Sequence, residues 1–334
     1  MKAAVLGGGS WGTTFAQVLC DAGTPVVLWC RRPELAAQIE ATRTSQRYLP
    51  GVTLPGSLRA TADASEALAD ADLVAMAVPA QTLRDNLTAW RSLLPSEAVL
   101  VSLMKGIELG TGDRMSQVIA EVTGAGRDRI AVISGPNLAL EIAARQYCAT
   151  VVACADEVVG SRLQQACHTG YFRAYTNPDI IGCELGGAVK NVIALAVGIA
   201  AGMGLGDNTR ATLITRGLAE IARLGAALGA DQHTFAGLAG LGDLVASCSS
   251  PLARNRSFGE KLGQGVPLAQ LLVSTTQAVE GVKSSQSVRQ LARDHGVEMP
   301  ITEVIAGVMH DGLAIADAAV LLASRSAKPE RYGV

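Results

Sequence analysis

The sequence predicts an α/β protein in which an N-terminal doubly wound sheet is followed by a C-terminal all-helical domain. Short apolar runs alternate with helical stretches in the first half, which is the pattern of parallel βαβ units. Strand signals fade after Asn177-Pro178, and helical segments follow. At 334 residues the chain also exceeds the ~250–300 residues at which single cores usually divide. We therefore expect two domains, residues 1–178 and residues 179–334.

The composition argues against several classes of partner. The net charge of −2 gives no electrostatic reason to expect nucleic acid or an anionic membrane. Mean hydropathy is +0.28, but the apolar run over residues 192–206 is shorter than the ~18 residues of a membrane span, so we expect no membrane insertion. The N-terminus lacks a signal-peptide pattern, and the seven cysteines contain no C-x-x-C pair. We expect a cytoplasmic protein with reduced thiols and no metal site.

A glycine-rich turn lies between the first expected strand and helix. Residues 2–6 (KAAVL) form an apolar strand-like run, and residues 13–22 have helical character. Between them, Gly7, Gly9 and Gly12 satisfy G-x-G-x-x-G. In that context the glycines allow a tight turn, close approach of a pyrophosphate and helix–strand packing, so the pattern indicates a Rossmann-type dinucleotide site. The alternative is a turn with a structural role only.

The second expected strand, Val26–Trp29, is followed by Arg31 and Arg32. A site selective for NAD usually has an acidic residue here to hold the ribose hydroxyls. Two arginines suit a 2′-phosphate instead, so we expect NADPH or NADH as cofactor, with the NADP form preferred. The open alternative is that both arginines are solvated loop charges.

The rest of the first half continues the alternation. Residues 43–58 are expected to form a loop; strands are expected over 72–78, 98–104, 130–134, 149–153 and 172–175, and helices over 81–90, 111–122 and 158–167. Lys105 and Gly135 directly follow two of these strands. Because ligands of doubly wound sheets bind beyond the carboxyl ends of the strands, Lys105 is a candidate phosphate or substrate ligand.

The second half contains a long apolar helix with a lysine inside it. Helices are expected over residues 180–203, 210–228, 259–263, 268–272, 281–295, 302–309 and 313–324. Lys190, with Asn191 beside it, lies in the first of these, where desolvation would disfavour its charged form and suit it to proton transfer. The alternative is that Lys190 reaches water from the helix end. Residues 248–256 are expected to form a loop rich in anion-binding groups such as Arg254.

Seven stretches together resemble the bacterial NAD(P)-dependent glycerol-3-phosphate dehydrogenase family. They are GGGSWGTT at Gly7, MKGIE at Met104, SGPNLALE at Ser134, the long GAVKNVIALAVGIAAGMGLGDNTRATLITRGLAE at Gly187, GLGDL at Gly240, SSPLARNRSFG at Ser249 and VEG at Val279. They span almost the entire chain. The resemblance implies that residues 1–178 bind the dinucleotide and residues 179–334 bind the substrate.

The resemblance also implies a reaction and a set of residues. The substrate pair would be dihydroxyacetone phosphate and sn-glycerol 3-phosphate, which feeds phospholipid synthesis, and Lys190 would be the proton acceptor, with Asn191 and Asp243 placed to orient it. Substrate contacts correspond to Lys105, Gly135, Asn137, Lys190, Asn191, Asp243, Arg254 and Asn255. Cofactor contacts correspond to Gly7, Gly9, Ser10, Trp11, Gly12, Arg31, Arg32, Tyr48, Lys105, Ala139, Arg254 and Glu280. A homodimer is also implied.

Three positions depart from the family pattern. Asn137 replaces a substrate-binding serine, Ala253 replaces the serine before Arg254, and Ala278 replaces a valine of the cofactor motif. Asn137 can still donate and accept hydrogen bonds, whereas the side chain of Ala253 cannot. Two other functions remain open: a related two-domain dehydrogenase of a 3-hydroxy acid, and a non-catalytic protein that senses NADP.

Overall fold

The computed structural model describes residues 1–275, 279–324, 326 and 329, so Ala278 lies outside the described residues. The chain forms two compact units. Unit 1 comprises Met1–Met104 and Met115–Ile180, and unit 2 comprises Lys105–Arg114 and Ile181–Val334. The chain therefore passes from one unit to the other at residues 104–105, 114–115 and 180–181.

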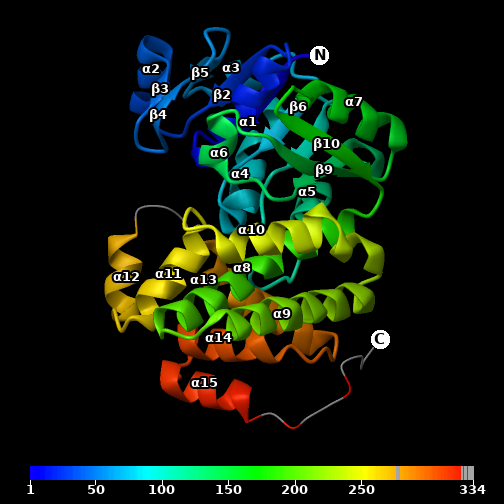
Figure 1. Ribbon diagram of the computed structural model, residues 1–334. Coiled ribbons are helices and arrows are strands. Elements are labelled where there is room, and N and C mark those ends of the chain that lie inside the picture. The colour runs from blue at the N-terminus through cyan, green and yellow to red at the C-terminus, as the bar shows by residue number, and fades with distance from the viewer. Residues whose placement is uncertain (276–278, 325, 327–328, 330–334) are drawn as a thin grey trace. The chain divides into compact units, whose positions relative to one another are not determined.

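Unit 1 is built on a sheet whose strands are ordered β10-β9-β8-β7-β6-β1-β2-β5. The strands are β1 Ala3–Leu6, β2 Val26–Trp29, β5 Arg59–Thr61, β6 Leu73–Met76, β7 Val99–Ser102, β8 Ile130–Ser134, β9 Cys148–Cys154 and β10 Phe172–Asn177. The helices are α1 Ser10–Asp21, α2 Pro33–Thr42, α3 Ala64–Leu68, α4 Leu83–Trp90, α5 Met115–Thr123, α6 Ala139–Ala143 and α7 Glu157–Cys167, with short 3₁₀ turns η1 Ala80–Thr82, η2 Arg91–Leu93 and η3 Arg127–Arg129. Figure 1 shows these helices around the sheet.

The sheet of unit 1 is buried on both faces. In β1, Ala3 and Val5 belong to one apolar core, whereas Ala4 and Leu6 belong to another. This alternation follows from the two-residue repeat of a strand. Helices α1 and α7 contribute to the first core, and α3, α4 and α5 contribute to the second. Cover on both faces explains why the strands read as continuous apolar runs in the sequence.

Two details of unit 1 differ from the sequence prediction. The sheet is mixed, because β9 runs antiparallel to β8, and β10 runs parallel to β9. The connection from β8 to β9 contains only the short helix α6. A parallel β9 would require a connection long enough to bring the chain back to the opposite end of β8, and α6 is too short for that. The expected loop over residues 43–58 contains a hairpin, β3 Thr44–Ser45 and β4 Leu49–Thr53. Pro50 is tolerated there because an outer strand need not donate a hydrogen bond at every residue.

Unit 2 is helical apart from the segment Lys105–Arg114. Its helices are α8 Ile180–Gly202, α9 Asp207–Ala227, α10 Asp243–Ser249, α11 Arg254–Gly263, α12 Leu268–Ser274, α13 Glu280–Asp294, α14 Pro300–His310 and α15 Ile315–Ala323, with η4 Gln232–Ala236 and the π-helical turn η5 Leu238–Gly242. By length and composition α8 could cross a membrane, but 89 % of its most apolar window is buried inside the protein. It is the central helix of this unit's core, with α9, α10, α11 and α13 around it in Figure 1.

Glycines bring α8 and α11 into close contact. A Cβ at Gly198 or Gly202 would lie 2.1 Å from a backbone carbonyl oxygen of α11. In the reverse direction, a Cβ at Gly259 or Gly263 would lie 2.3 or 2.2 Å from a carbonyl oxygen of α8. Both pairs are spaced four residues apart, which places them on one face of each helix. The contact brings the first turn of α11 close to the middle of α8.

The polar stretch before α11 was wrongly predicted as a loop from Cys248 to Arg256. Cys248 and Ser249 end α10, and Arg254 begins α11, so only the residues between them connect the two helices. The sequence Arg254-Asn255-Arg256-Ser257 carries almost no apolar signal, so the helix period is hidden at its start. Arg254 and Asn255 therefore occupy a helix N-terminus rather than an irregular loop.

The segment Lys105–Arg114 follows β7 of unit 1 in the chain yet groups with unit 2. The sequence placed it in the first domain because it lies between a strand and a helix of the sheet. Its Ile107 is fully buried in the core that surrounds α8. Burial of this side chain among the helices explains the grouping.

Candidate functional site

The glycine-rich turn of unit 1 is shaped by close backbone contacts. Gly7 has φ +133°, and a Cβ there would lie 2.5 Å from the carbonyl oxygen of Ala77. A Cβ at Gly12 would lie 2.0 Å from the carbonyl oxygen of Gly7. A Cβ at Gly9 would meet nothing within 4 Å, so this glycine borders open space before α1. No side chain caps the N-terminus of α1, which begins at Ser10. A turn of this shape, open at a helix N-terminus, fits a pyrophosphate.

Several buried polar side-chain atoms of unit 1 have no hydrogen-bond partner inside the described chain. They include Trp11 Nε1, Asn137 Oδ1 and Ser134 Oγ. Buried polar groups are nearly always hydrogen-bonded, and leaving one unsatisfied costs about 1–3 kcal/mol. A bound dinucleotide and substrate would offer donors and acceptors at such a place. The residues present therefore fit a dinucleotide cofactor.

Arg32, which follows β2, contacts Tyr48, which lies between β3 and β4. Arg32 Nη2 donates a hydrogen bond to the Tyr48 hydroxyl at 3.3 Å, and its guanidinium lies 5.6 Å from the centre of the Tyr48 ring. Ser10 Oγ donates to the carbonyl oxygen of Tyr48 at 3.1 Å, which ties the start of α1 to this group. Arg31 is solvent-exposed beside them. The structure thus gathers Ser10, Arg31, Arg32 and Tyr48 at one end of unit 1.

Gly135, Asn137 and Ala139 follow the carboxyl end of β8, which runs in the same direction as β1. Asn137 Nδ2 donates to Thr150 Oγ1 at 3.0 Å, and the Thr150 hydroxyl donates to the Ser134 carbonyl at 3.1 Å. Ala139 begins α6, and its carbonyl accepts a hydrogen bond from Thr14 of α1 at 3.2 Å. These bonds hold the β8 end against the helix that follows the glycine turn.

In unit 2 a single carboxylate binds two lysines. Asp243, at the start of α10, is 1 % exposed. Its Oδ1 accepts a hydrogen bond from Lys190 Nζ, and its Oδ2 accepts one from Lys105 Nζ at 2.6 Å. Lys190 Nζ also donates to Ser247 Oγ at 2.7 Å. Lys190 is 7 % exposed, so it is a buried, paired lysine and does not reach water from a helix end.

The two ammonium groups and one carboxylate give the cluster an unusual charge balance. Burial lowers the pKa of Lys105 and the charge of Asp243 raises it, while the positive charge of Lys190 lowers it, so that the pKa falls to about 7. A perturbed lysine beside a second lysine is typical of a site where charge develops during a reaction.

A hydrogen-bonded chain of amides connects the cluster to two other helices. Asn191 Nδ2 donates to the Lys105 carbonyl at 3.3 Å, and Asn191 Oδ1 accepts from Asn255 Nδ2 at 2.9 Å. Asn255 Oδ1 accepts the backbone N–H of Gly281 at 3.0 Å. Arg254 precedes Asn255, and the negative charge of Glu280 at the start of α13 acts on it. The predicted residues of unit 2 thus form one connected group.

Ser247 is the member of this group that sequence reasoning missed. It lies four residues after Asp243, one turn along α10, so the two side chains share a helix face. That spacing was readable only once residues 243–249 were recognised as helical.

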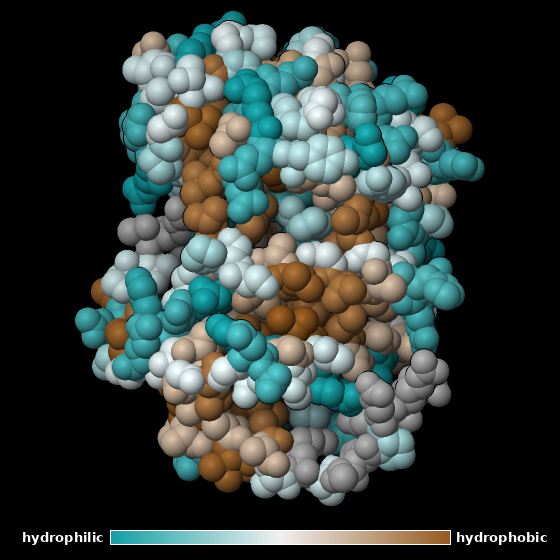
Figure 2. Space-filling view, in the orientation of Figure 1, coloured by the Kyte–Doolittle hydropathy of each residue, from teal (hydrophilic) through white to brown (hydrophobic). Residues whose placement is uncertain are grey.

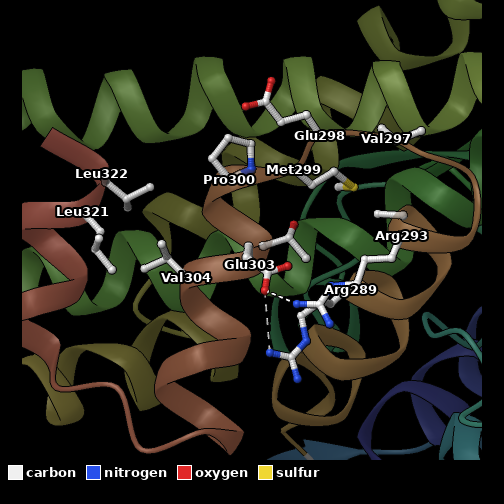
Figure 3. Close-up of a pocket in the computed structure, with 12 residues that line it drawn as sticks. Arg289, Arg293, Val297, Glu298, Met299, Pro300, Glu303, Val304, Leu321 and Leu322 are labelled. Atoms are coloured by element: carbon white, nitrogen blue, oxygen red, sulfur yellow. Dashed lines mark hydrogen bonds and ion pairs between the residues drawn. The ribbon is translucent and has the colours of Figure 1, made fainter. Parts of the chain in front are cut away.

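A cavity of about 380 Å³ lies elsewhere in unit 2, between α13, α14 and α15 (Figure 3). Arg289 and Arg293 point into it, but both contact the Glu303 carboxylate. Arg289 also binds Asp311 at 2.5 Å. None of the predicted site residues lines this cavity, so the cavity is distinct from the candidate site.

Comparison with known proteins identifies the family. Residues 2–159 match the family model for the NAD-dependent glycerol-3-phosphate dehydrogenase N-terminus, and residues 179–320 match that for its C-terminus. The chain is 62 % identical over 331 residues to glycerol-3-phosphate dehydrogenase [NAD(P)+] of Streptomyces griseus, covering 99 % of this chain and 98 % of that protein. The chain belongs to the NAD-dependent glycerol-3-phosphate dehydrogenase family.

Structural comparison agrees with this family. The crystal structure of glycerol-3-phosphate dehydrogenase from Coxiella burnetii matches with a TM-score of 0.93 and 37 % identity, covering 97 % of this chain and 99 % of that one. The predicted fold class, a Rossmann-type sheet followed by a helical domain, is confirmed. A ketopantoate reductase from Ralstonia eutropha matches with a TM-score of 0.58 at 16 % identity and shares the fold alone. Full-length agreement with dehydrogenases also removes the NADP-sensing alternative from consideration.

Proposed function

We propose that unit 1 binds the NAD(P) cofactor and unit 2 carries out proton transfer and holds the substrate phosphate. The reaction is that of the family: it interconverts dihydroxyacetone phosphate and sn-glycerol 3-phosphate with NAD(P). NAD(P)H, when bound, supplies the hydride. The observation that carries the proposal is the sharing of Asp243 between Lys190 and Lys105.

Lys190 is the proton-transfer group in this proposal. Reduction of the ketone places negative charge on its oxygen, and a buried ammonium group stabilises that charge and donates the proton. Asp243 and Ser247 accept hydrogen bonds from Lys190 and so fix the direction of its Nζ. In the oxidative direction, a neutral Lys190 accepts the hydroxyl proton. Asn191 fixes the start of the Lys105 segment through the Lys105 carbonyl.

The first turn of α11 is the proposed phosphate site. Arg254 offers a planar fork of donors, Asn255 adds amide donors, and no side chain caps this helix N-terminus because residue 253 is alanine. Lys105 supplies a second positive charge. We assign Gly135 and Asn137 of unit 1 to the remaining substrate contacts, and the buried Asn137 Oδ1 without a partner supports this role.

The cofactor residues proposed in unit 1 are those of the glycine turn and the end of β2. Gly7, Gly9 and Gly12 shape the pyrophosphate site, with Ser10 and Trp11 at the start of α1. Arg31, Arg32 and Tyr48 are the proposed contacts of a 2′-phosphate, and the hydrogen bond from Arg32 to Tyr48 supports a preference for the NADP form. Ala139, Lys105, Arg254 and Glu280 are the further proposed cofactor contacts.

We also infer a homodimer that works in the cytoplasm and supplies glycerol 3-phosphate for phospholipid synthesis. All seven cysteines are free, as expected in a reducing compartment. Figure 2 shows hydrophobic residues gathered on the surface of the helical unit. Leu241, Val245 and Leu252 of this unit are exposed. Exposed apolar patches often mark protein contacts. Light scattering on the purified chain would decide between monomer and dimer.

The direct test is turnover of dihydroxyacetone phosphate. The purified chain should oxidise NADPH when dihydroxyacetone phosphate is added, and should form glycerol 3-phosphate in equal amount. The Lys190→Met variant, purified in the same way, controls for contaminating host enzymes. The proposal would be wrong if a folded protein that binds the cofactor formed no product with either NADPH or NADH.

A further inference from the structure

The segment Lys105–Arg114 is a closed turn stabilised by its own backbone. Ile107 and Arg114 pair as an antiparallel bridge. The N–H of Glu108 donates to the Asp113 carbonyl at 2.9 Å, and the N–H of Gly112 donates to the Glu108 carbonyl at 3.1 Å. The closure fixes the two ends of the segment relative to each other. A force that holds Arg114 in place therefore also restrains the backbone that leads to Lys105.

Arg114 is held by a buried ion pair on α8. Its Nη1 lies 2.5 Å from Glu184 Oε2, and the two side chains are only 13 % and 3 % exposed. Glu184 belongs to the same helix as Lys190. Ile107, on the other side of the bridge, is fully buried among apolar side chains. The turn thus contacts α8 through a buried ion pair, and its Ile107 belongs to the same apolar core as the side chains of α8.

A charged contact at this depth is a poor way to gain stability. The free-energy cost of desolvating two buried charges offsets most of their attraction. Proteins in which well-packed apolar residues replace a buried ion pair are often as stable as the original or more stable. An ion pair does, however, specify direction and register, because an arginine fork matches a carboxylate in few geometries. An apolar contact such as that of Ile107 permits small sliding movements. The pair therefore adds positional definition that Ile107 alone does not provide.

We propose that Arg114 and Glu184 are positioning residues for Lys105: their ion pair fixes the closed turn against α8, so that Lys105 Nζ stays on Asp243 beside Lys190. Asn191 forms the second attachment, since its Nδ2 donates to the Lys105 carbonyl at 3.3 Å. This inference rests on the proposed role of Lys105 in substrate binding.

The test combines Glu184→Gln with a substitution of Lys105, the residue that Glu184 is proposed to position. Glu184→Gln removes the charge and keeps the shape, and it is made in the wild type and in a Lys105→Ala background. Glu220→Gln is the matched control: Glu220 is 2 % exposed, lies in α9 of the same unit, and accepts the N–H groups of Ile301 and Thr302 at the start of α14. The same chemical change at similar depth is thus made away from the turn.

In the wild type, Glu184→Gln should lower kcat/KM for dihydroxyacetone phosphate by ~10- to 100-fold, because a misplacement of about 1 Å can cost 10²-fold. It should also shift the pH profile of kcat/KM. A variant that is only less stable would keep the wild-type pH profile. In the Lys105→Ala background the same change should cost less than ~2-fold, because residues that act through one another are not additive. Glu220→Gln should lower the melting temperature and leave the pH profile unchanged.

Two outcomes would overturn the inference in different ways. If Lys105→Ala alone leaves kcat/KM unchanged, the role of Lys105 fails and the inference fails with it. If Lys105→Ala is damaging but Glu184→Gln costs the same factor in both backgrounds, only the inference fails. Should Glu184→Gln not fold, the double variant Arg114→Met/Glu184→Met replaces the pair by apolar side chains and is measured in its place. Wild-type kcat/KM and pH profile in that variant would then refute the positioning role.

Discussion

The lysine cluster of unit 2 and the glycine turn of unit 1 satisfy their polar groups in opposite ways. Lys190, Lys105 and Asp243 are hydrogen-bonded to one another within the protein. In unit 1, Trp11 Nε1 beside the glycine turn and Asn137 Oδ1 after β8 are buried with no partner in the described chain. The first region is ordered by its own contacts, whereas the second retains buried polar atoms without a partner, as expected of a region that binds a ligand.

This difference predicts different kinetic consequences. A group that is already oriented contributes in the transition state, so its loss should lower kcat. A group that waits for a ligand contributes to binding, so its loss should raise Kd or KM. The following predictions test that division, from the largest expected effect to the smallest.

Lys190→Met should have the largest effect on turnover. The change roughly preserves volume and removes the proton and the charge. General acid–base catalysis contributes ~10²–10⁴-fold, so kcat should fall at least that far. NADPH affinity, measured by fluorescence titration, should stay within a few-fold of wild type, because this variant leaves the proposed pyrophosphate site at the glycine turn unchanged. Retention of about a tenth of wild-type turnover would exclude Lys190 as the proton-transfer group.

Arg254→Ala should separate phosphate binding from chemistry. Loss of two charge-assisted hydrogen bonds, at ~1.5 kcal/mol each, should lower kcat/KM on dihydroxyacetone phosphate by roughly 100-fold. Dihydroxyacetone without the phosphate should be a poor substrate of the wild type, and the variant should use it at nearly the same rate. Equal slowing on both substrates would mean that Arg254 serves the cofactor or the fold instead.

Replacing Arg31 and Arg32 together by Ala should affect cofactor choice only. A charge-assisted contact to the 2′-phosphate is worth ~1.5–3 kcal/mol, so the NADPH to NADH ratio of kcat/KM should fall by roughly ten- to hundred-fold. The rate at saturating NADH should not change. An unaltered ratio would identify both arginines as solvated surface charges.

Glycine substitutions distinguish the inner and outer parts of the turn. Gly9→Ala places a methyl group in open space, so the melting temperature should be retained while NADPH affinity drops roughly tenfold, about 1.4 kcal/mol. Gly12→Ala, the paired variant, would push a Cβ to 2.0 Å from the Gly7 carbonyl oxygen and should destabilise unit 1 itself. Normal NADPH affinity in Gly9→Ala would argue against close approach of the pyrophosphate.

The smallest effect concerns the shape of a pH profile. Because burial lowers the pKa of Lys105 to about 7, this lysine is charged below that pH and loses its proton as pH rises through it. The kcat/KM for dihydroxyacetone phosphate should therefore decline above pH ~7. Lys105→Arg keeps the charge at all these pH values, so its normalised profile should stay flat to higher pH. Identical normalised profiles would show that another group sets the alkaline limb.

Much of the fold was predictable because local patterns dominate it. The glycine turn, with a strand before it and a helix after it, specifies the start of unit 1, and the apolar length of α8 specifies a core helix. The reversed direction of β9 was not predictable, since nothing in an apolar strand records the direction of its neighbour. The start of α11 was hidden because its first residues are polar on every side.

The candidate site was predictable in its members but not in its connections. Lys190 was singled out as a lysine in an apolar helix, and Asp243 was expected to orient it; the structure adds that the same carboxylate also accepts a hydrogen bond from Lys105. Pairing between distant residues leaves no trace in one sequence. The membership of Lys105 in unit 2 was missed for the same reason, because the burial of Ile107 and the Arg114–Glu184 pair decide it.

The glycine contact between α8 and α11 has a consequence for how the specificity of this enzyme can diverge. At Gly198 and Gly259 the two backbones meet without intervening side chains, so no rotamer exists that could widen or narrow the gap between the helices. The spacing of the two helices at these glycines is therefore set by van der Waals contact between the two backbones. Descendants with longer or shorter substrates would have to vary the residues at the start of α11, while the helix spacing stayed constant.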